Sequence, residues 1–132
     1  MIVGCGIDVV RVERIQRLLD RFGRRAGERV LGAEELAEWE QGSMRAAFLA
    51  KRFAVKEAAA KALGTGFRSG IRYCDISVGH DGLGAPYLHL GGAARRRAEA
   101  LGVIGQHVSL SDERGLAIAQ VILEGATRSL SE

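Results

Sequence analysis

The feature that most constrains the fold is the segment from Arg52 to Leu63, which consists almost entirely of strong helix formers and stops at Gly64-Thr65-Gly66. The segment predicts a helix of roughly twenty residues that ends at Leu63. This helix carries a carboxylate, Glu57, which is a candidate metal ligand. It also carries three cations that are candidates for binding phosphate: Arg52, Lys56 and Lys61.

Length and composition predict one domain spanning residues 1–132. The chain has 132 residues and is 47% hydrophobic, so it can form one core but buries only roughly two-thirds of its unfolded surface, which favours self-association. It has no apolar run of about 18 residues and no signal peptide, so we expect a cytoplasmic protein with no membrane partner. Cys5 and Cys74 match no metal-binding spacing, and we interpret both as small buried thiols.

Hydrophobic periodicity divides the rest of the chain into helices and strands. Helical spacing recurs in residues 11–22, 33–41 and 93–101. Strand patterns occupy residues 1–10, 71–78, 86–90, 107–111 and 116–123. An Asp81-Gly82 turn joins two of these strands in a predicted hairpin. The order predicts an α+β fold, with a small antiparallel sheet packed against one long helix and several short ones.

The net charge of +3 is unevenly distributed, because seven arginines fall within nineteen residues: Arg11, Arg14, Arg17, Arg21, Arg24, Arg25 and Arg29. We call this set the arginine face and expect an acidic partner to bind it. Nucleic acid is one candidate, but the chain is only 5% aromatic and carries no nucleic-acid-binding signature. An acidic protein is the other candidate, and an ordinary solvated surface is the simplest explanation.

Two carboxylates could form a metal site. Asp8 lies in an apolar strand, where a carboxylate must be paired, metal-bound or protonated, and a salt bridge to an arginine would satisfy it. Glu57 precedes Lys61 by four residues, a spacing that an ordinary helical ion pair also explains. If Asp8 and Glu57 converge, they form a good Mg²⁺ site together with water and phosphate oxygens.

Two other features leave their roles open. His107 and Ser109 alternate on a predicted strand without a triad partner, so we do not expect a nucleophilic-serine hydrolase, and His107 is either structural or catalytic. Gly64-Thr65-Gly66 either caps the helix or lets backbone amides approach a phosphate or a base.

Three motifs together carry a family resemblance: Gly4-x-Gly6-Ile7-Asp8, the segment from Arg52 to Gly66, and His107-Val108-Ser109-Leu110-Ser111. In this order and at these separations they resemble holo-[acyl-carrier-protein] synthase, the short bacterial class of 4′-phosphopantetheinyl transferases. The resemblance covers nearly the whole chain. It implies transfer of phosphopantetheine from coenzyme A to a serine of apo acyl carrier protein, with release of adenosine 3′,5′-bisphosphate, by default for fatty-acid biosynthesis.

The resemblance also implies residue roles. Asp8 and Glu57 would hold Mg²⁺ at the coenzyme A pyrophosphate, and Lys61 would neutralise charge there. His107 would lie beside the same cofactor, binding phosphate or assisting proton movement. The proton acceptor for the serine would be Glu57 or a metal-bound water. The nucleotide end would be held by Arg52, Lys56, Gly64, Thr65 and Gly66.

The partner implied by the resemblance is an acidic, helical carrier protein, which matches the arginine face. Five residues are predicted to dock it: Arg14, Leu18, Arg21, Arg25 and Arg29. Ile15 and Phe22 would add apolar contact or packing. The segment from Gly23 to Gly27 fits the usual pattern only with a one-residue adjustment, and Asp112 replaces a histidine of many family members.

The short class of this family is a homotrimer with active sites between subunits, so a homotrimer is implied for this chain. The rival hypothesis is a non-catalytic basic module that binds an acidic protein or nucleic acid through the Arg11 to Arg29 face.

Overall fold

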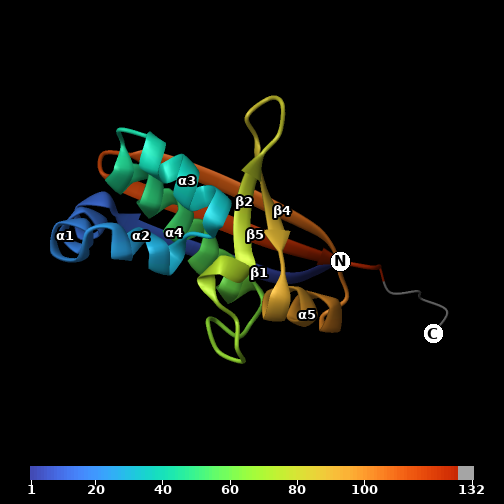
Figure 1. Ribbon diagram of the computed structural model, residues 1–132. Helices are drawn as coiled ribbons and strands as arrows, with labels where there is room; N and C mark the ends of the chain where they lie inside the picture. Colours follow the sequence, from blue (N-terminus) through green and yellow to red (C-terminus); the bar gives the residue numbers. More distant parts are fainter. Residues whose placement is uncertain (128–132) are drawn as a thin grey trace.

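The computed structural model describes residues 1–127, which form five helices, five strands and one 3₁₀ turn (Figure 1). The elements follow the chain as β1 (Ile2–Arg11), α1 (Val12–Phe22), α2 (Arg24–Val30), α3 (Ala33–Gln41), α4 (Arg45–Ala62), η1 (Tyr73–Asp75), β2 (Ile76–His80), β3 (Pro86–Leu90), α5 (Gly92–Ala100), β4 (Val103–Glu113) and β5 (Leu116–Gly125). The predicted α+β class and its long central helix are confirmed.

The main sheet has three antiparallel strands in the order β1-β5-β4, and β2 and β3 form a separate hairpin. Strands β4 and β5 are joined by Arg114 and Gly115, which both have positive φ, as the tightest hairpin turns require. In the register of the sheet, Asp8 lies opposite Ala119, and Ala119 lies opposite Leu110. Residues directly opposite each other share a face, so these three side chains lie on the same face.

Helix α4 covers this face of the sheet at very short range. A Cβ atom on Gly6 would lie 2.0 Å from the carbonyl oxygen of Ala58, and one on Gly4 would lie 2.1 Å from that of Ala62. The two glycines therefore let the backbone of β1 touch the backbone of α4. Because side chains alternate along a strand, Asp8 follows Gly4 and Gly6 on this face and is directed toward α4.

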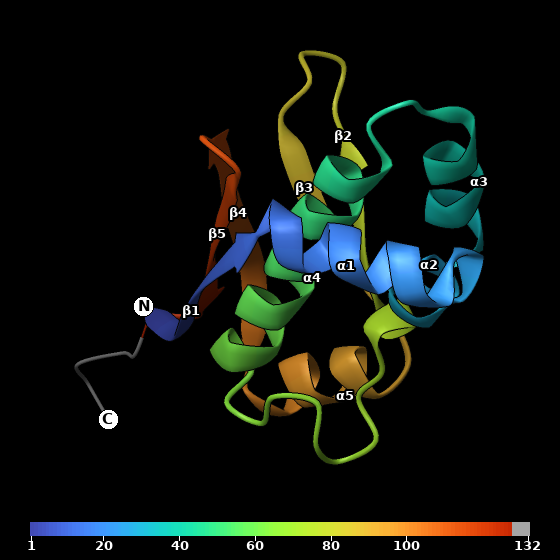
Figure 2. The same cartoon turned by 90° about the vertical axis from the view of Figure 1, so that its left-hand side faces the viewer.

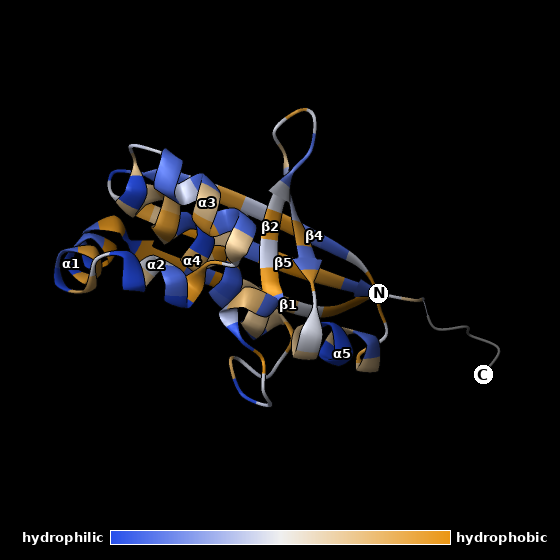
Figure 3. Cartoon of the chain, in the orientation of Figure 1, coloured by the Kyte–Doolittle hydropathy of each residue, from blue (hydrophilic) through white to orange (hydrophobic). Residues whose placement is uncertain are grey.

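The opposite face of the main sheet is not covered by any part of the described chain, as Figure 2 shows: the sheet stands on one side, with α4 and the other helices on the other. Ile7 and Val9 are both 55% exposed on this outer face, and Ile118 is 36% exposed. Figure 3 shows hydrophobic residues along β5 and a mixture of hydrophilic and hydrophobic residues on α1 and α5. The strand predicted to be buried at residues 1–10 is thus buried on one face.

Three expectations from the sequence are wrong. The strand predicted over residues 71–78 begins only at Ile76, because residues before it form η1, where the Asp75 carboxylate accepts a hydrogen bond from the Arg72 amide. Cys5 and Cys74 are exposed and not buried. Residues 24–30 form the unpredicted helix α2, in which Gly27 allows a close approach to the Trp39 ring.

Candidate active site

Asp8 lies near the end of β1 and has one satisfied and one unsatisfied oxygen. The ammonium group of Lys61, on α4, contacts Asp8 Oδ1 at 3.0 Å and the Ile7 carbonyl oxygen at 3.0 Å. Asp8 Oδ2 is buried and has no hydrogen-bond partner among residues 1–127. The salt bridge expected for Asp8 therefore forms with a lysine and not with an arginine, and it leaves one carboxylate oxygen available as a ligand.

Glu57 lies one helical turn before Lys61 on the same side of α4. Its Oε1 accepts a 2.7 Å hydrogen bond from the Tyr73 hydroxyl. Burial and this hydrogen bond to Glu57 raise the pKa of the Tyr73 hydroxyl above its usual value, so the hydroxyl stays protonated at neutral pH and donates. Within the described part of the chain Lys61 pairs with Asp8, so the simple ion pair of Glu57 with Lys61 does not form.

The donors present fit Mg²⁺ better than a transition metal. No group of three or more histidine, cysteine, aspartate or glutamate side chains comes together in residues 1–127. A metal held by Asp8 and Glu57 would therefore complete its shell with water and substrate oxygens, as Mg²⁺ does. The unsatisfied Asp8 Oδ2 is the observation in this structure that points to such a ligand.

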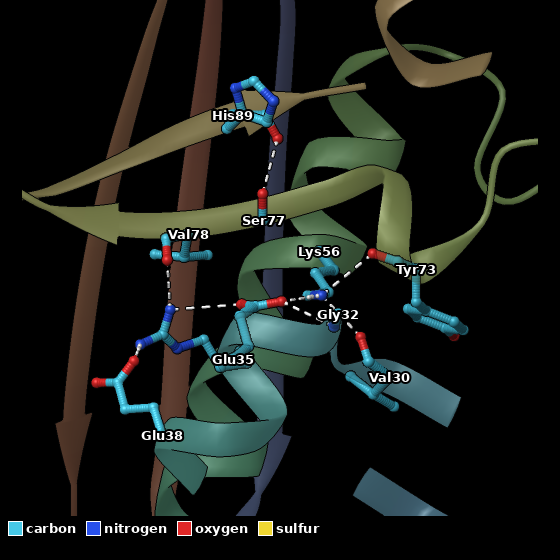
Figure 4. Close-up of polar contacts among 10 residues, drawn as sticks. Val30, Gly32, Glu35, Glu38, Lys56, Tyr73, Ser77, Val78 and His89 are labelled. Atoms are coloured by element: carbon cyan, nitrogen blue, oxygen red, sulfur yellow. Dashed lines mark hydrogen bonds and ion pairs between the residues drawn. The ribbon is translucent and has the colours of Figure 1, made fainter. Parts of the chain in front are cut away.

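Lys56 is not available to bind a cofactor, contrary to the prediction. Its side chain is fully buried, and its ammonium group contacts Glu35 Oε1 at 2.7 Å, the Val30 carbonyl at 2.7 Å and the Tyr73 carbonyl at 3.1 Å. Figure 4 shows Lys56 and Glu35 pointing toward each other between α3 and α4. Burial lowers the pKa of the Lys56 ammonium, and the Glu35 carboxylate acts in the opposite direction.

Arg52 is also buried, so its predicted role in holding the nucleotide is wrong in the same way. One guanidinium nitrogen donates to the Val78 carbonyl at 2.7 Å and to Glu35 Oε2 at 3.4 Å. The other terminal nitrogen lies 3.6 Å from Glu38 Oε2. Arg52 and Lys56 together neutralise the buried Glu35 and tie α4 to α3 and the β2-β3 hairpin. The burial of Glu35 could not be predicted, because the helix at residues 33–41 is rich in acidic residues, which are mostly exposed in proteins.

Gly64-Thr65-Gly66 ends α4 as a helix cap. Gly64 and Gly66 have φ values of 82° and 60°, and the Gly66 amide donates to the Ala60 carbonyl at 3.1 Å. Arg97 of α5 donates to the Leu63 carbonyl at 2.9 Å and so supplies one more partner for the helix end. A contact of this segment with the nucleotide stays a prediction.

His107 lies on the outer face of the sheet, away from Asp8. In the register of the sheet, His107 lies directly opposite Ile122, and Ile122 lies directly opposite Cys5, so these three side chains share one face. Asp8 lies on the other face, which packs against α4. The Nε2 of His107 is 3.3 Å from Glu124 Oε1. Within a single chain, Asp8 therefore lies on the face of the sheet that packs against α4, the helix that carries Glu57 and Lys61. His107 lies on the opposite face of the sheet.

The arginine face is exposed, and part of it has no acidic partner. Arg17 pairs with Glu13, and Arg24 pairs with Glu28 and Glu40. The four predicted docking arginines form no ion pair within residues 1–127: Arg14, Arg21, Arg25 and Arg29.

Apolar side chains accompany these arginines. Phe22 is 40% exposed, and the guanidinium carbons of Arg21 and Arg25 lie over its ring at 5.1 and 6.0 Å from the ring centre. Leu18 is exposed, whereas Ile15 is buried and packs beneath α1. Asp112 is the residue that departs from the family pattern, and its Oδ2 lies 3.9 Å from the Nζ of Lys51.

Comparison with known proteins identifies relatives over nearly the full chain. Residues 4–120 match the model of the 4′-phosphopantetheinyl transferase superfamily. A holo-[acyl-carrier-protein] synthase of Alkalilimnicola ehrlichii is 54% identical over 127 residues, 96% of this chain and 99% of the relative. The described part of the chain contains no helix that is long and apolar enough to span a membrane.

Solved structures agree with this relationship. The crystal structure of holo-[acyl-carrier-protein] synthase from Neisseria meningitidis is 43% identical and superposes with a TM-score of 0.88, covering 94% of this chain and 99% of that one. The Bacillus anthracis synthase in complex with CoA (3′,5′-ADP) is 38% identical with a TM-score of 0.78, covering 96% and 99% of the two chains.

Proposed function

The chain belongs to the holo-[acyl-carrier-protein] synthase family of phosphopantetheinyl transferases, and we propose that it carries out Mg²⁺-dependent transfer of 4′-phosphopantetheine from coenzyme A to a serine of apo acyl carrier protein. The unsatisfied, buried Asp8 Oδ2 beside Lys61, with Glu57 one turn away, is the observation that carries the proposal. The coenzyme A bound to the Bacillus anthracis relative supports the donor substrate.

In this reaction the carrier serine oxygen attacks the β-phosphorus of coenzyme A. A new phosphorus–oxygen bond forms, and the bond to adenosine 3′,5′-bisphosphate breaks. Mg²⁺ held by Asp8 and Glu57 would neutralise charge on the pyrophosphate. Lys61 is about half exposed beside Asp8, so its ammonium group can also reach the charge that develops there. The serine proton needs an acceptor, for which Glu57 is the candidate on this chain.

The carrier protein is proposed to dock on α1 and α2. Arg14, Arg21, Arg25 and Arg29 are exposed and form no ion pair within the described residues, so they can pair with acidic residues of a partner. Leu18 and Phe22 offer apolar contact within the same surface. This combination suits an acidic protein with an apolar patch better than a nucleic acid. A surface that binds single-stranded nucleic acid usually carries a series of aromatic residues on which bases stack, and this surface does not.

We also propose a homotrimer whose active sites lie between subunits. The outer face of the main sheet exposes Ile7, Val9 and Ile118, an apolar surface suited to burial against another copy. His107 lies on this same face. A neighbouring subunit packed there would bring its own Asp8 and Glu57 near this His107, which no single chain does. We propose in addition that the chain is cytoplasmic and that its carrier protein serves fatty-acid synthesis.

Intact-mass measurement tests the transfer. Apo acyl carrier protein is incubated with the purified chain, coenzyme A and Mg²⁺, and parallel samples contain EDTA or lack coenzyme A. We expect the carrier to gain the mass of one phosphopantetheine group with Mg²⁺ and to gain nothing in the two parallel samples. A carrier that binds the chain in a salt-sensitive way but never gains mass would instead support the non-catalytic basic module.

A further inference from the structure

Tyr73 connects the proposed metal site to the buried ion network, and the sequence did not single it out. Its hydroxyl donates to Glu57 Oε1 at 2.7 Å, which leaves Oε2 free of this hydrogen bond. We propose that Tyr73 is a positioning residue that holds the Glu57 carboxylate in the orientation needed to bind the metal. The inference rests on the proposed function, because it assigns a task to Tyr73 at the same site.

The ring of Tyr73 packs against two other aromatic rings. The ring centres of Tyr73 and Phe67 are 4.0 Å apart, with 32° between their planes. The Phe53 ring of α4 also stacks on the Tyr73 ring, with the ring centres 5.8 Å apart and 24° between the planes. Aromatic pairs at these distances are favourable, and a packed ring has few rotamers. The hydroxyl is therefore aimed at Glu57 by packing and not only by its own hydrogen bond.

The backbone of Tyr73 is fixed by the buried network. The fully buried Lys56 ammonium donates to the Tyr73 carbonyl at 3.1 Å. Asp75, two residues further on, is 8% exposed; its carboxylate caps the Arg72 amide and its carbonyl accepts from the Gly91 amide at 2.8 Å. Lys56 and Glu57 are neighbours on α4. Lys56 anchors the backbone of Tyr73, and the Tyr73 hydroxyl orients Glu57.

This arrangement has the form of an outer-shell contact to a metal ligand. Such contacts fix the direction of the ligand, and their loss commonly weakens metal binding by about 10- to 100-fold. It also gives Lys56 a function other than the phosphate binding that the sequence suggested. From the core, Lys56 holds in place the residue that orients Glu57.

The test is Tyr73→Phe, which removes the hydroxyl and keeps the ring against Phe53 and Phe67. Tyr87→Phe is the matched control, since Tyr87 is 53% exposed on the hairpin and is the other tyrosine of the chain. Mn²⁺ binding is measured by electron paramagnetic resonance in the presence of coenzyme A, together with thermal unfolding. We expect Tyr73→Phe to weaken Mn²⁺ binding about tenfold, and to raise the Mg²⁺ concentration for half-maximal transfer equally.

The outcomes separate the inference from the proposed function. If the wild type transfers phosphopantetheine but Tyr73→Phe binds Mn²⁺ as the wild type does, the positioning role is overturned and the function stands. Equal weakening by Tyr87→Phe, or a lower unfolding temperature with unchanged Mn²⁺ affinity, also overturns the positioning role. A wild type that neither binds Mn²⁺ with coenzyme A nor transfers the group overturns both.

Discussion

At the scale of single residues, Lys56 and Glu57 show that the type of a residue does not determine its task. They are adjacent on α4, but successive helical residues point about 100° apart, so one enters the core and the other faces the site. Both were predicted to bind ligand groups, but the structure places Lys56 against Glu35 in the core. Helix propensity identified the segment, and only the position of Glu35 on α3 determined which cation would be buried.

The buried role of Lys56 predicts a large loss of stability in Lys56→Met. The substitution leaves the buried Glu35 carboxylate with Arg52 as its one ion-pair partner within residues 1–127, and breaking a buried pair in this way costs about 3 to 5 kcal/mol. Lys51→Met on the same helix is the control, because Lys51 is only loosely paired with Asp112 at the surface and its loss should cost less than about 1 kcal/mol. Urea unfolding measures both, and equal stabilities would contradict the buried role.

At the scale of elements, the contact of β1 with α4 brings Asp8 to Lys61. The sequence predicted both elements correctly. It could not show how closely they pack, which depends on Gly4 and Gly6 lying against carbonyl groups of the helix. The sequence also missed α2, a helix of seven residues that contains Gly27, a poor helix former. Gly27 in fact provides room for Trp39, a tertiary contact that no local pattern reveals.

The close contact predicts that Gly6→Ala is strongly destabilising. Its Cβ atom would lie 2.0 Å from the Ala58 carbonyl oxygen and 2.8 Å from the Ala62 amide, so backbone must move. We expect a loss of about 3 kcal/mol and a fall in transfer rate as Asp8 shifts. Gly82→Ala in the hairpin loop is the control, because an added Cβ there meets nothing within 4 Å. Thermal unfolding checks the comparison, and an unchanged Gly6→Ala protein would contradict it.

The exposed surface of α1 and α2 predicts an electrostatic effect on docking. Arg21→Ala should raise the KM for the carrier protein about three- to tenfold at low salt, with little change in kcat, and the difference should shrink as salt is added. Arg96→Ala removes the same charge from exposed α5, away from the arginine face, and should leave the KM unchanged. Initial rates over a range of carrier concentrations give both values. Equal effects of the two substitutions would show that only net charge matters.

At the scale of the whole molecule, the proposed trimer accounts for two features of the single chain: the exposed outer face of the sheet, and the position of His107 on the face opposite Asp8. The sequence could list His107 among the site residues through the family resemblance. It could not show that one chain separates His107 from Asp8, because that depends on the register of β1, β5 and β4. Local patterns predict elements, whereas assembly depends on which faces remain uncovered.

A shared site predicts that two inactive variants rescue each other. Asp8→Asn and His107→Ala should each be nearly inactive alone. If the chains are refolded together in equal amounts, about a quarter of the sites would combine the intact His107 of one chain with the intact Asp8 of another. Transfer by the mixture should recover to a similar fraction of the wild-type rate. No recovery in mixed trimers would place the whole site within one chain.

The claim that Asp8 and Glu57 form a metal-dependent transfer site is tested most directly by the rate at which apo carrier protein gains the phosphopantetheine mass with Glu57→Gln. Glu99→Gln, on the exposed surface of α5 and paired with Arg95, is the control. We expect Glu57→Gln to fold normally but to transfer more than about a hundredfold more slowly at saturating Mg²⁺, whereas Glu99→Gln should match the wild type. Transfer by Glu57→Gln at the wild-type rate would contradict the claim.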